Sequence, residues 1–148
     1  MSFLSIYRLY LNGAFFSKVS TDGGGNDQDP DMAGIEANLS MQYAVGLANF
    51  LLVTFYSVGQ SDFVGLIHLA EHILRERNPP TVLTISYGFI ENQVPRSLAA
   101  RLCDTFMQLG ARGISVIVAS GDGGVAGSRP NNTCIQFVPT FPASCPFS

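Results

Sequence analysis

Apolar residues recur at helical spacing in three stretches of the chain. Residues 33–50 form the first, residues 63–77 the second and residues 95–111 the third. Each stretch has apolar side chains three or four positions apart, the repeat that places them on one face of a helix. In the first stretch the spacing predicts a single apolar stripe, made by Ile35, Leu39, Tyr43 and Leu47.

Short runs of β-branched and aromatic residues separate these helices and predict strands near 15–19 and over 51–58, 81–87 and 114–120. Strands that alternate with helices of a dozen or more residues favour an α/β fold, with a parallel sheet flanked by helices on both faces. In such sheets, sites form where the strands end at their carboxyl edge. Gly88 and the glycine-rich segment around Asp122 both lie at that edge in this prediction.

Composition narrows the classes of function. A chain of 148 residues suits one domain or part of a larger one, and 47% hydrophobic residues suffice for a buried core. The net charge of −3 argues against nucleic acid as a main partner, because phosphate binding needs a basic face. No apolar run reaches the roughly 18 residues of a membrane-spanning helix, so no membrane partner is expected.

The first 20 residues form an atypical N-terminal segment. The first 16 of them are apolar, but Arg8 interrupts this stretch and it has no basic start. They therefore do not match a secretory signal peptide.

The segment VIVASGDGG, residues 116–124, carries the sharpest local signal. A predicted buried strand runs into a glycine-rich turn that bears one carboxyl group, Asp122. Glycines permit positive φ and leave backbone amides open to a ligand, and a protonated carboxyl group can donate a hydrogen bond to an oxyanion. The alternative is an ordinary strand-ending turn in which Asp122 caps local amides. A dinucleotide loop is disfavoured, because no helix is predicted after the glycines.

Two further pairs of side chains have a spacing that is compatible with catalysis or metal binding. Glu36 and Ser40 lie four residues apart and share a helix face, so a carboxylate can act next to a hydroxyl, although such pairs are common on helices. His68 and His72 stand in an H-x-x-E-H sequence, which suits zinc but also occurs on ordinary amphipathic helices. A zinc site also needs a third ligand, and we expect no metal here.

Three cysteines are present. Cys134 and Cys145 lie in a short Pro-rich stretch, close enough in sequence to close a small loop. Cys103 falls in an apolar helical pattern and is expected to be a buried thiol. One short-range bridge is consistent with an oxidising compartment.

Four segments that follow one another in order resemble the sedolisin family of serine-carboxyl peptidases, in particular fungal tripeptidyl-peptidase-like members. The resemblance runs from about Asp22 to Phe147. It implies a subtilisin-like α/β fold and a partial peptidase domain over 21–148, incomplete at its C-terminus. The segments are GIEANLSMQYAVGLA, PPTVLTISYG, LGARGISVIVASGDGGVAG and FVPTFPASCPF.

The resemblance also implies roles for individual residues. Glu36 matches the general base of the family and Asp122 the carboxyl group that stabilises the oxyanion. Ser40 stands where the family has an aspartate, and a serine cannot share a proton with Glu36 as a second carboxyl group would. By the same resemblance Gly88, Gly121 and Gly123 border the substrate cleft, and Cys134 pairs with Cys145.

The nucleophile of the family lies in a Gly-Thr-Ser motif, which does not occur in these 148 residues. We therefore expect a fragment of an acid-acting endopeptidase or tripeptidyl-peptidase that is inactive by itself. No cofactor is expected, because the calcium site of the family is also C-terminal. The implied partner is a peptide or protein substrate, and the implied location is extracellular. The alternative is a non-catalytic remnant that binds peptides or a protease.

Overall fold

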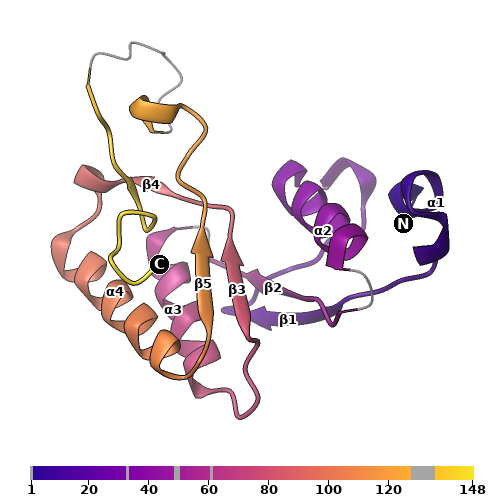
Figure 1. Ribbon diagram of the computed structural model, residues 1–148, viewed down its shortest axis with the longest axis horizontal. Coiled ribbons are helices and arrows are strands. Elements are labelled where there is room, and N and C mark those ends of the chain that lie inside the picture. Colours follow the sequence, from indigo (N-terminus) through magenta and orange to yellow (C-terminus); the bar gives the residue numbers. More distant parts are fainter. Residues whose placement is uncertain (1, 33, 49–50, 61, 128–135) are drawn as a thin grey trace. The chain divides into compact units, whose positions relative to one another are not determined.

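The computed structural model describes residues 2–32, 34–48, 51–60, 62–127 and 136–148. The chain divides into two compact units, Met1–Gly59 and Gln60–Ser148. Each unit contains its own pair of parallel strands (Figure 1). The prediction of parallel pairing between strands linked by helices is confirmed in both units.

The first unit is a β-α-β arrangement preceded by a short helix. Strands β1 and β2 pair in parallel, in a register that runs from Ser17 opposite Thr54 to Thr21 opposite Val58. Helix α2 lies in the connection between them, as a parallel pair requires. The elements are α1 (Ser2–Tyr7), β1 (Ser17–Thr21), α2 (Ile35–Ala48) and β2 (Thr54–Val58).

The N-terminal segment belongs to the core of this unit. Leu4 of α1 and Leu11 are buried together with Val45 of α2, and Phe16 packs against them. The boundary expected between residues 20 and 21 lies inside β1. Residues 1–20 thus contribute a helix, part of a strand and two core side chains.

The predicted apolar stripe of α2 is not the face that packs on this core. The four stripe residues are all exposed, Ile35 by 88% and Leu39 by 50%. Met41 and Val45, on another side of the helix, face the core instead. The prediction of the buried face was wrong because α2 carries apolar residues on most of its circumference, so spacing alone cannot select one side.

The second unit contains a parallel pair, two long helices and a short antiparallel pair. Strands β3 and β5 pair in parallel from Val82 opposite Ser115 to Ile85 opposite Val118. Strands β4 and β6 pair antiparallel through Phe89 and Phe141. The elements are α3 (Phe63–Arg75), β3 (Val82–Ile85), β4 (Phe89–Ile90), α4 (Arg96–Ala111), β5 (Ser115–Val118) and β6 (Thr140–Phe141).

Helices α3 and α4 pack side by side against one face of β3 and β5 (Figure 1). Leu83 and Ile85 point to that face and are buried, whereas Val82 and Ile117 are 52% and 58% exposed. Within this unit the described helices cover one face of the pair (Figure 1).

Polar contacts hold the two helices in place. The Asp62 carboxylate caps α3 by accepting a hydrogen bond of 3.1 Å from the Gly65 amide. Arg101 of α4 pairs with Glu71 of α3, with Nε 2.9 Å from Oε1. None of the helices that the structure describes is long and apolar enough to cross a bilayer.

Candidate functional site

The first part of the candidate site lies at the N-terminal end of α2. Glu36 falls in the first turn of this helix, where the helix dipole favours a carboxylate. The Ser40 hydroxyl donates a hydrogen bond of 2.8 Å to Glu36 Oε1. Both residues are half-buried. The shared helix face predicted from their spacing is therefore confirmed, and the hydroxyl holds one oxygen of the carboxylate.

The second part is the turn that follows β5. Gly121 and Gly124 have φ of +89° and +58°, values that favour glycine, whereas Gly123 has an ordinary φ of −98°. The Gly123 amide donates to the Gly127 carbonyl at 2.6 Å, so it is engaged within the loop. Asp122 is exposed at the tip of this turn. The turn conformation is as expected, but the carboxyl group is not enclosed and the Gly123 amide is not open to a ligand.

In the part of this segment that the structure describes, up to Gly127, Gly124–Ala126 form a single 3-10 turn. This turn by itself offers a phosphate no helix dipole of the kind that a dinucleotide loop uses.

The ends of β3 and β5 meet at one edge, as the parallel topology requires. The Ala119 amide donates to the Ile85 carbonyl at 3.0 Å. Gly88, three residues after β3, lies against the segment that contains β6. A Cβ atom at Gly88 would stand 2.6 Å from Thr140 Cγ2 and 3.3 Å from the Phe141 carbonyl oxygen. Only glycine allows this close approach without movement of the neighbouring strand.

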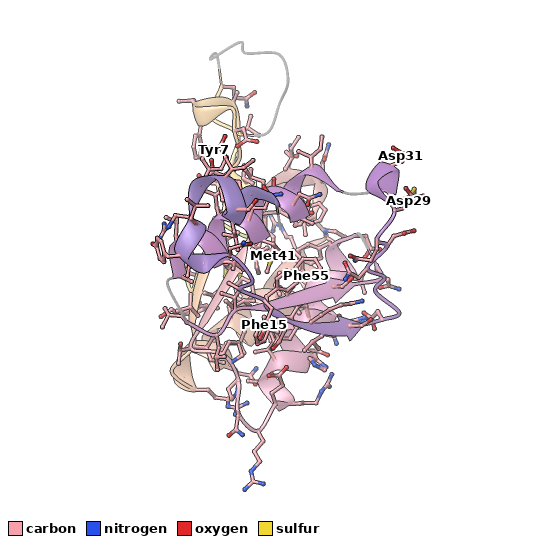
Figure 2. All side chains as sticks on the ribbon, turned by 90° about the vertical axis from the view of Figure 1, so that its right-hand side faces the viewer. Tyr7, Phe15, Asp29, Asp31, Met41 and Phe55 are labelled. Atoms are coloured by element: carbon pink, nitrogen blue, oxygen red, sulfur yellow. A yellow bond between two sulfur atoms is a disulfide. The ribbon has the colours of Figure 1, made fainter. Side chains whose placement is uncertain are left out.

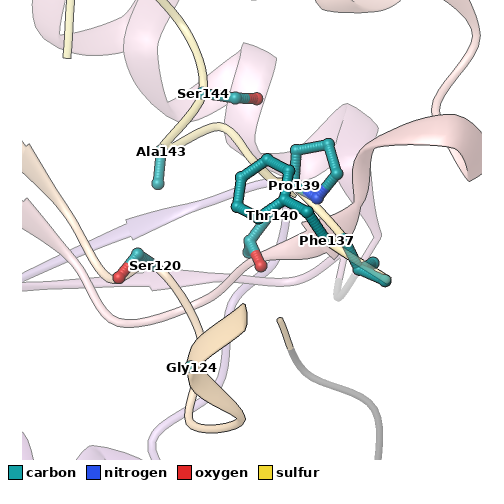
Figure 3. Close-up of a pocket in the computed structure, with 8 residues that line it drawn as sticks. Ser120, Gly124, Phe137, Pro139, Thr140, Ala143 and Ser144 are labelled. Carbon is teal, nitrogen blue, oxygen red and sulfur yellow. The ribbon is translucent and has the colours of Figure 1, made fainter. Parts of the chain in front are cut away.

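A pocket of about 230 Å³ opens at this edge (Figure 3). Ser120 and Gly124, on either side of the Asp122 turn, form one wall, and the segment from 137 to 144 forms the other. Gly88, Gly121 and Gly123, the residues predicted to border a cleft, do not line this pocket, although Gly88 contacts Thr140, which does. The lining residues are Ser120, Gly124, Phe137, Val138, Pro139, Thr140, Ala143 and Ser144.

Sequence reasoning missed most of this lining. The segment FVPTFPASCPF was noted only as part of a resemblance, and its polar members carry no spacing that points to a site. The three prolines and the glycine-rich turn indicate two irregular segments. They do not indicate that the two segments face each other.

The disulfide in the structure differs from the predicted one. Cys145 is bonded to Cys103 of α4, with the two Cα atoms 5.8 Å apart. The predicted pairing of Cys134 with Cys145 is therefore wrong for Cys145, and Cys134 lies outside the described residues. Cys103 is also not a free thiol. The fold brings together two cysteines 42 residues apart in sequence, so closeness in sequence was a poor guide to partners.

The H-x-x-E-H pattern lies on α3 and has structural contacts. Glu71, its acidic member, pairs with Arg101, and His72 Nε2 lies 3.3 Å from Glu76 Oε1. Among the described residues, no group of three or more His, Cys, Asp or Glu side chains is placed to hold a metal ion. The contacts of Glu71 and His72 agree with the reading of α3 as an ordinary amphipathic helix.

Comparison with known sequences finds fungal peptidases. The chain is 37% identical over 164 aligned residues to a probable tripeptidyl-peptidase SED3 of Arthroderma benhamiae. It is 36% identical over 165 residues to the tripeptidyl-peptidase SED2 of Arthroderma otae. Each alignment covers 98% of this chain and 28% of the relative, so the chain spans just over a quarter of the relatives' length. No model of a known protein family matches the sequence.

Comparison with solved structures finds the same architecture. The fold matches a Pseudomonas sedolisin, described as a serine-carboxyl proteinase in complex with two molecules of pseudo-iodotyrostatin, with a TM-score of 0.71. The match covers 99% of this chain and 41% of that protein at 23% sequence identity, so it shows the fold alone. The predicted subtilisin-like α/β fold class is confirmed.

Proposed function

The chain belongs to the sedolisin family of serine-carboxyl peptidases in the region that it shares with its relatives, and we propose that it forms the part of such a peptidase that carries the general base and the oxyanion-stabilising acid. The substrates are peptides or proteins, and the reaction is hydrolysis of a peptide bond in acid. The observation that carries the proposal is the hydrogen bond from the Ser40 hydroxyl to the Glu36 carboxylate, between residues one helical turn apart.

In this mechanism Glu36, Asp122 and Ser40 each have a separate task. Glu36 accepts the proton of the attacking serine hydroxyl as the hydroxyl adds to the peptide carbonyl. Asp122, in its protonated form, donates a hydrogen bond to the oxygen that becomes negative in the tetrahedral intermediate. Ser40 orients the Glu36 carboxylate through the hydrogen bond to Oε1.

The serine itself is not assigned within this chain. The Gly-Thr-Ser motif that carries it in the family does not occur among the 148 residues. By this mechanism the purified chain alone should therefore not hydrolyse peptides. If the 148-residue chain showed acid peptidase activity, and Glu36→Gln abolished it, the chain would have to contain its own nucleophile. That result would refute the expectation that the chain alone is inactive.

A helix graft tests the role of Glu36 directly. In an active tripeptidyl-peptidase of the family, the segment aligned with residues 34–48 is replaced by GIEANLSMQYAVGLA from this chain. Release of a tripeptide from a chromogenic substrate is measured in acid. Glu36→Gln in the graft should lower kcat by about 10²–10⁴-fold, because a general base is lost. Glu36→Asp should retain part of the activity, and equal thermal stability of the three proteins excludes misfolding. Full activity of the Gln variant would refute the proposal.

The family relation also supports an extracellular location for the whole protein. It leaves two kinds of activity for the whole protein, endopeptidase and tripeptidyl-peptidase. The relatives named above carry the tripeptidyl-peptidase name, and this supports release of tripeptides.

A second candidate function is peptide binding without turnover. Ser40, which stands at the position of the family aspartate, is the observation that favours it. The candidate predicts saturable binding of a peptide to the 148-residue chain, measured by calorimetry, with no cleavage product. Absence of binding would remove it.

A further inference from the structure

The first unit contains a pocket that the proposed peptidase mechanism does not use. It has a volume of about 530 Å³, within the range of small-molecule sites. All of its lining residues belong to Met1–Gly59, so its geometry is internal to that unit. They are Phe16, Gly25, Asn26, Asp27, Gln28, Asp29, Met32, Gly34, Ala37, Asn38, Met41, Gln42, Phe55 and Ser57.

The pocket combines an apolar floor with a polar, acidic rim. Phe16, Met41 and Phe55 are half-buried and supply the floor. Figure 2 shows Met41 and Phe55 close together, with Asp29 farther out on its loop. The rim is the loop from 25 to 29, whose side chains are amides and carboxylates. A ligand that fits both parts has an apolar body and a polar, positively charged end, because aromatic faces and carboxylates both attract cations.

The net charge of the first unit also favours a positively charged ligand. Residues 1–59 contain two basic and five acidic side chains, whereas residues 60–148 contain six of each. The first unit therefore carries the whole net charge of −3. None of the residues that line the pocket is basic. No positive side chain of the lining competes with a cationic ligand for Asp27 or Asp29.

The rim loop is fixed at its root, so it presents the carboxylates in a defined place. Gly24 lies so close to the Ser57 backbone that a Cβ atom would overlap it. The Ser57 hydroxyl donates to the Gly25 carbonyl, and the Ser20 hydroxyl donates to the Gly24 carbonyl at 2.6 Å. Preorganisation of this kind lowers the entropy lost when a ligand binds.

The loop is also shaped by its own carboxylates. Asp27 Oδ1 accepts a hydrogen bond of 2.9 Å from the Asp29 amide, and Asp29 Oδ1 accepts one of 3.0 Å from the Asp31 amide. Each of these bonds uses Oδ1, and both side chains border the pocket. Asp31 follows in the 3-10 turn Pro30–Met32 and does not line the pocket.

The pocket is separate from the Glu36–Ser40 pair. The α2 residues that line it are 37, 38, 41 and 42, spaced as one face of a helix, together with Gly34 before the helix. Glu36 and Ser40 are not among them. A ligand in the pocket therefore contacts α2 from another side than the side that carries the proposed general base.

We propose that this pocket is a binding site for a primary ammonium group on an apolar stem, as in a lysine side chain of a peptide or at a peptide amino terminus. The stem packs against Phe16, Met41 and Phe55, and the ammonium group lies at the rim against Asp27 and Asp29. The proposal goes beyond peptide hydrolysis and does not depend on it, since it requires neither the base nor a nucleophile.

Three short peptides test the proposal with the 148-residue chain, by calorimetry at neutral pH and low salt. They are acetyl-alanyl-lysyl-alanine amide, its norleucine analogue with an acetylated amino terminus, and the same norleucine peptide with a free amino terminus. The lysine peptide or the free-terminus peptide should bind at least about tenfold more tightly than the blocked norleucine peptide, since one charged hydrogen bond contributes roughly that factor. Whichever cationic peptide binds identifies the source of the ammonium group.

Matched variants of the loop locate the binding. The double variant Asp27→Asn, Asp29→Asn should abolish the preference for the cationic peptide, whereas Asp31→Asn should keep it. Phe55→Leu should weaken binding of all three peptides, and circular dichroism confirms that each variant folds. Equal affinity for charged and neutral peptides would overturn the proposal. So would a loss in Asp31→Asn half as large as in the double variant or larger, because binding would then follow net charge alone.

Discussion

Gly88 and Thr140 lie in contact across the edge of the second unit, 52 positions apart in sequence. A Cβ atom on Gly88 would stand 2.6 Å from Thr140 Cγ2, closer than carbon atoms approach in folded proteins. Thr140 belongs to β6 and lines the pocket beside the Asp122 turn. The absence of a side chain at Gly88 thus sets where one wall of that pocket lies.

Replacing Gly88 with alanine should destabilise the second unit by about 1–3 kcal/mol, because overpacking forces β6 to move. Urea unfolding followed by circular dichroism measures the free energy of unfolding. Gly110→Ala is the matched control, since nothing lies within 4 Å of a Cβ atom there and alanine favours the helix. Thr140→Ser removes the clashing methyl group and should restore part of the stability of Gly88→Ala. A Gly88→Ala variant as stable as the native chain would contradict the contact.

The bond between Cys103 and Cys145 predicts a defined result in peptide mapping without reductant. A fragment that contains Cys103 should be linked to the fragment that contains Cys145. Cys103→Ser should lower the free energy of unfolding by about 2–4 kcal/mol, as expected when a long loop is opened. Recovery of a Cys134–Cys145 fragment in the native chain would instead support the pairing predicted from sequence.

The N-cap of α3 depends on one side chain. Asp62→Ala removes the hydrogen bond to the Gly65 amide and should cost about 1 kcal/mol. Asp62→Asn keeps an acceptor oxygen at the same position and should lose much less. Equal destabilisation by both substitutions, measured by thermal unfolding, would mean that the charge of Asp62 and not its capping bond stabilises the helix.

Ser40 offers a test of the acid chemistry in the helix graft. Ser40→Asp places a second carboxyl group beside Glu36, so the two can share a proton, and the pH–rate profile should show two coupled ionisations in acid. Activity at low pH should rise as a result. Ser40→Ala removes the hydrogen bond to Glu36 and should lower kcat more than it changes KM. A profile unaffected by either change would show that position 40 does not position the base.

The long elements of the fold could be predicted from the sequence. Helix α3 ends two residues before its predicted limit, and α4 begins one residue after, because apolar spacing and flanking prolines mark helices of this length well. The two-residue strands β4 and β6 could not be predicted. Their pairing depends on a partner 50 residues away, and two residues have no periodicity of their own.

The candidate site could be predicted only in part. Helical spacing sufficed to place Ser40 against Glu36, because residues four apart on a helix are neighbours. The contact partner of Cys145, the lining of the pocket at Thr140 and the acidic pocket at Asp27 all depend on tertiary packing. A pattern along the chain contains no distance between α4 and the segment after β6, so these features required the structure.

The end of α3 has a consequence for the order in which the chain acquires its structure. Arg112 donates hydrogen bonds to the carbonyls of Leu74 and Glu76, the latter at 2.9 Å. During synthesis on the ribosome, those carbonyls remain hydrated until 36 to 38 further residues have emerged. The C-terminal end of α3 therefore gains these two hydrogen bonds only after α4 has been translated.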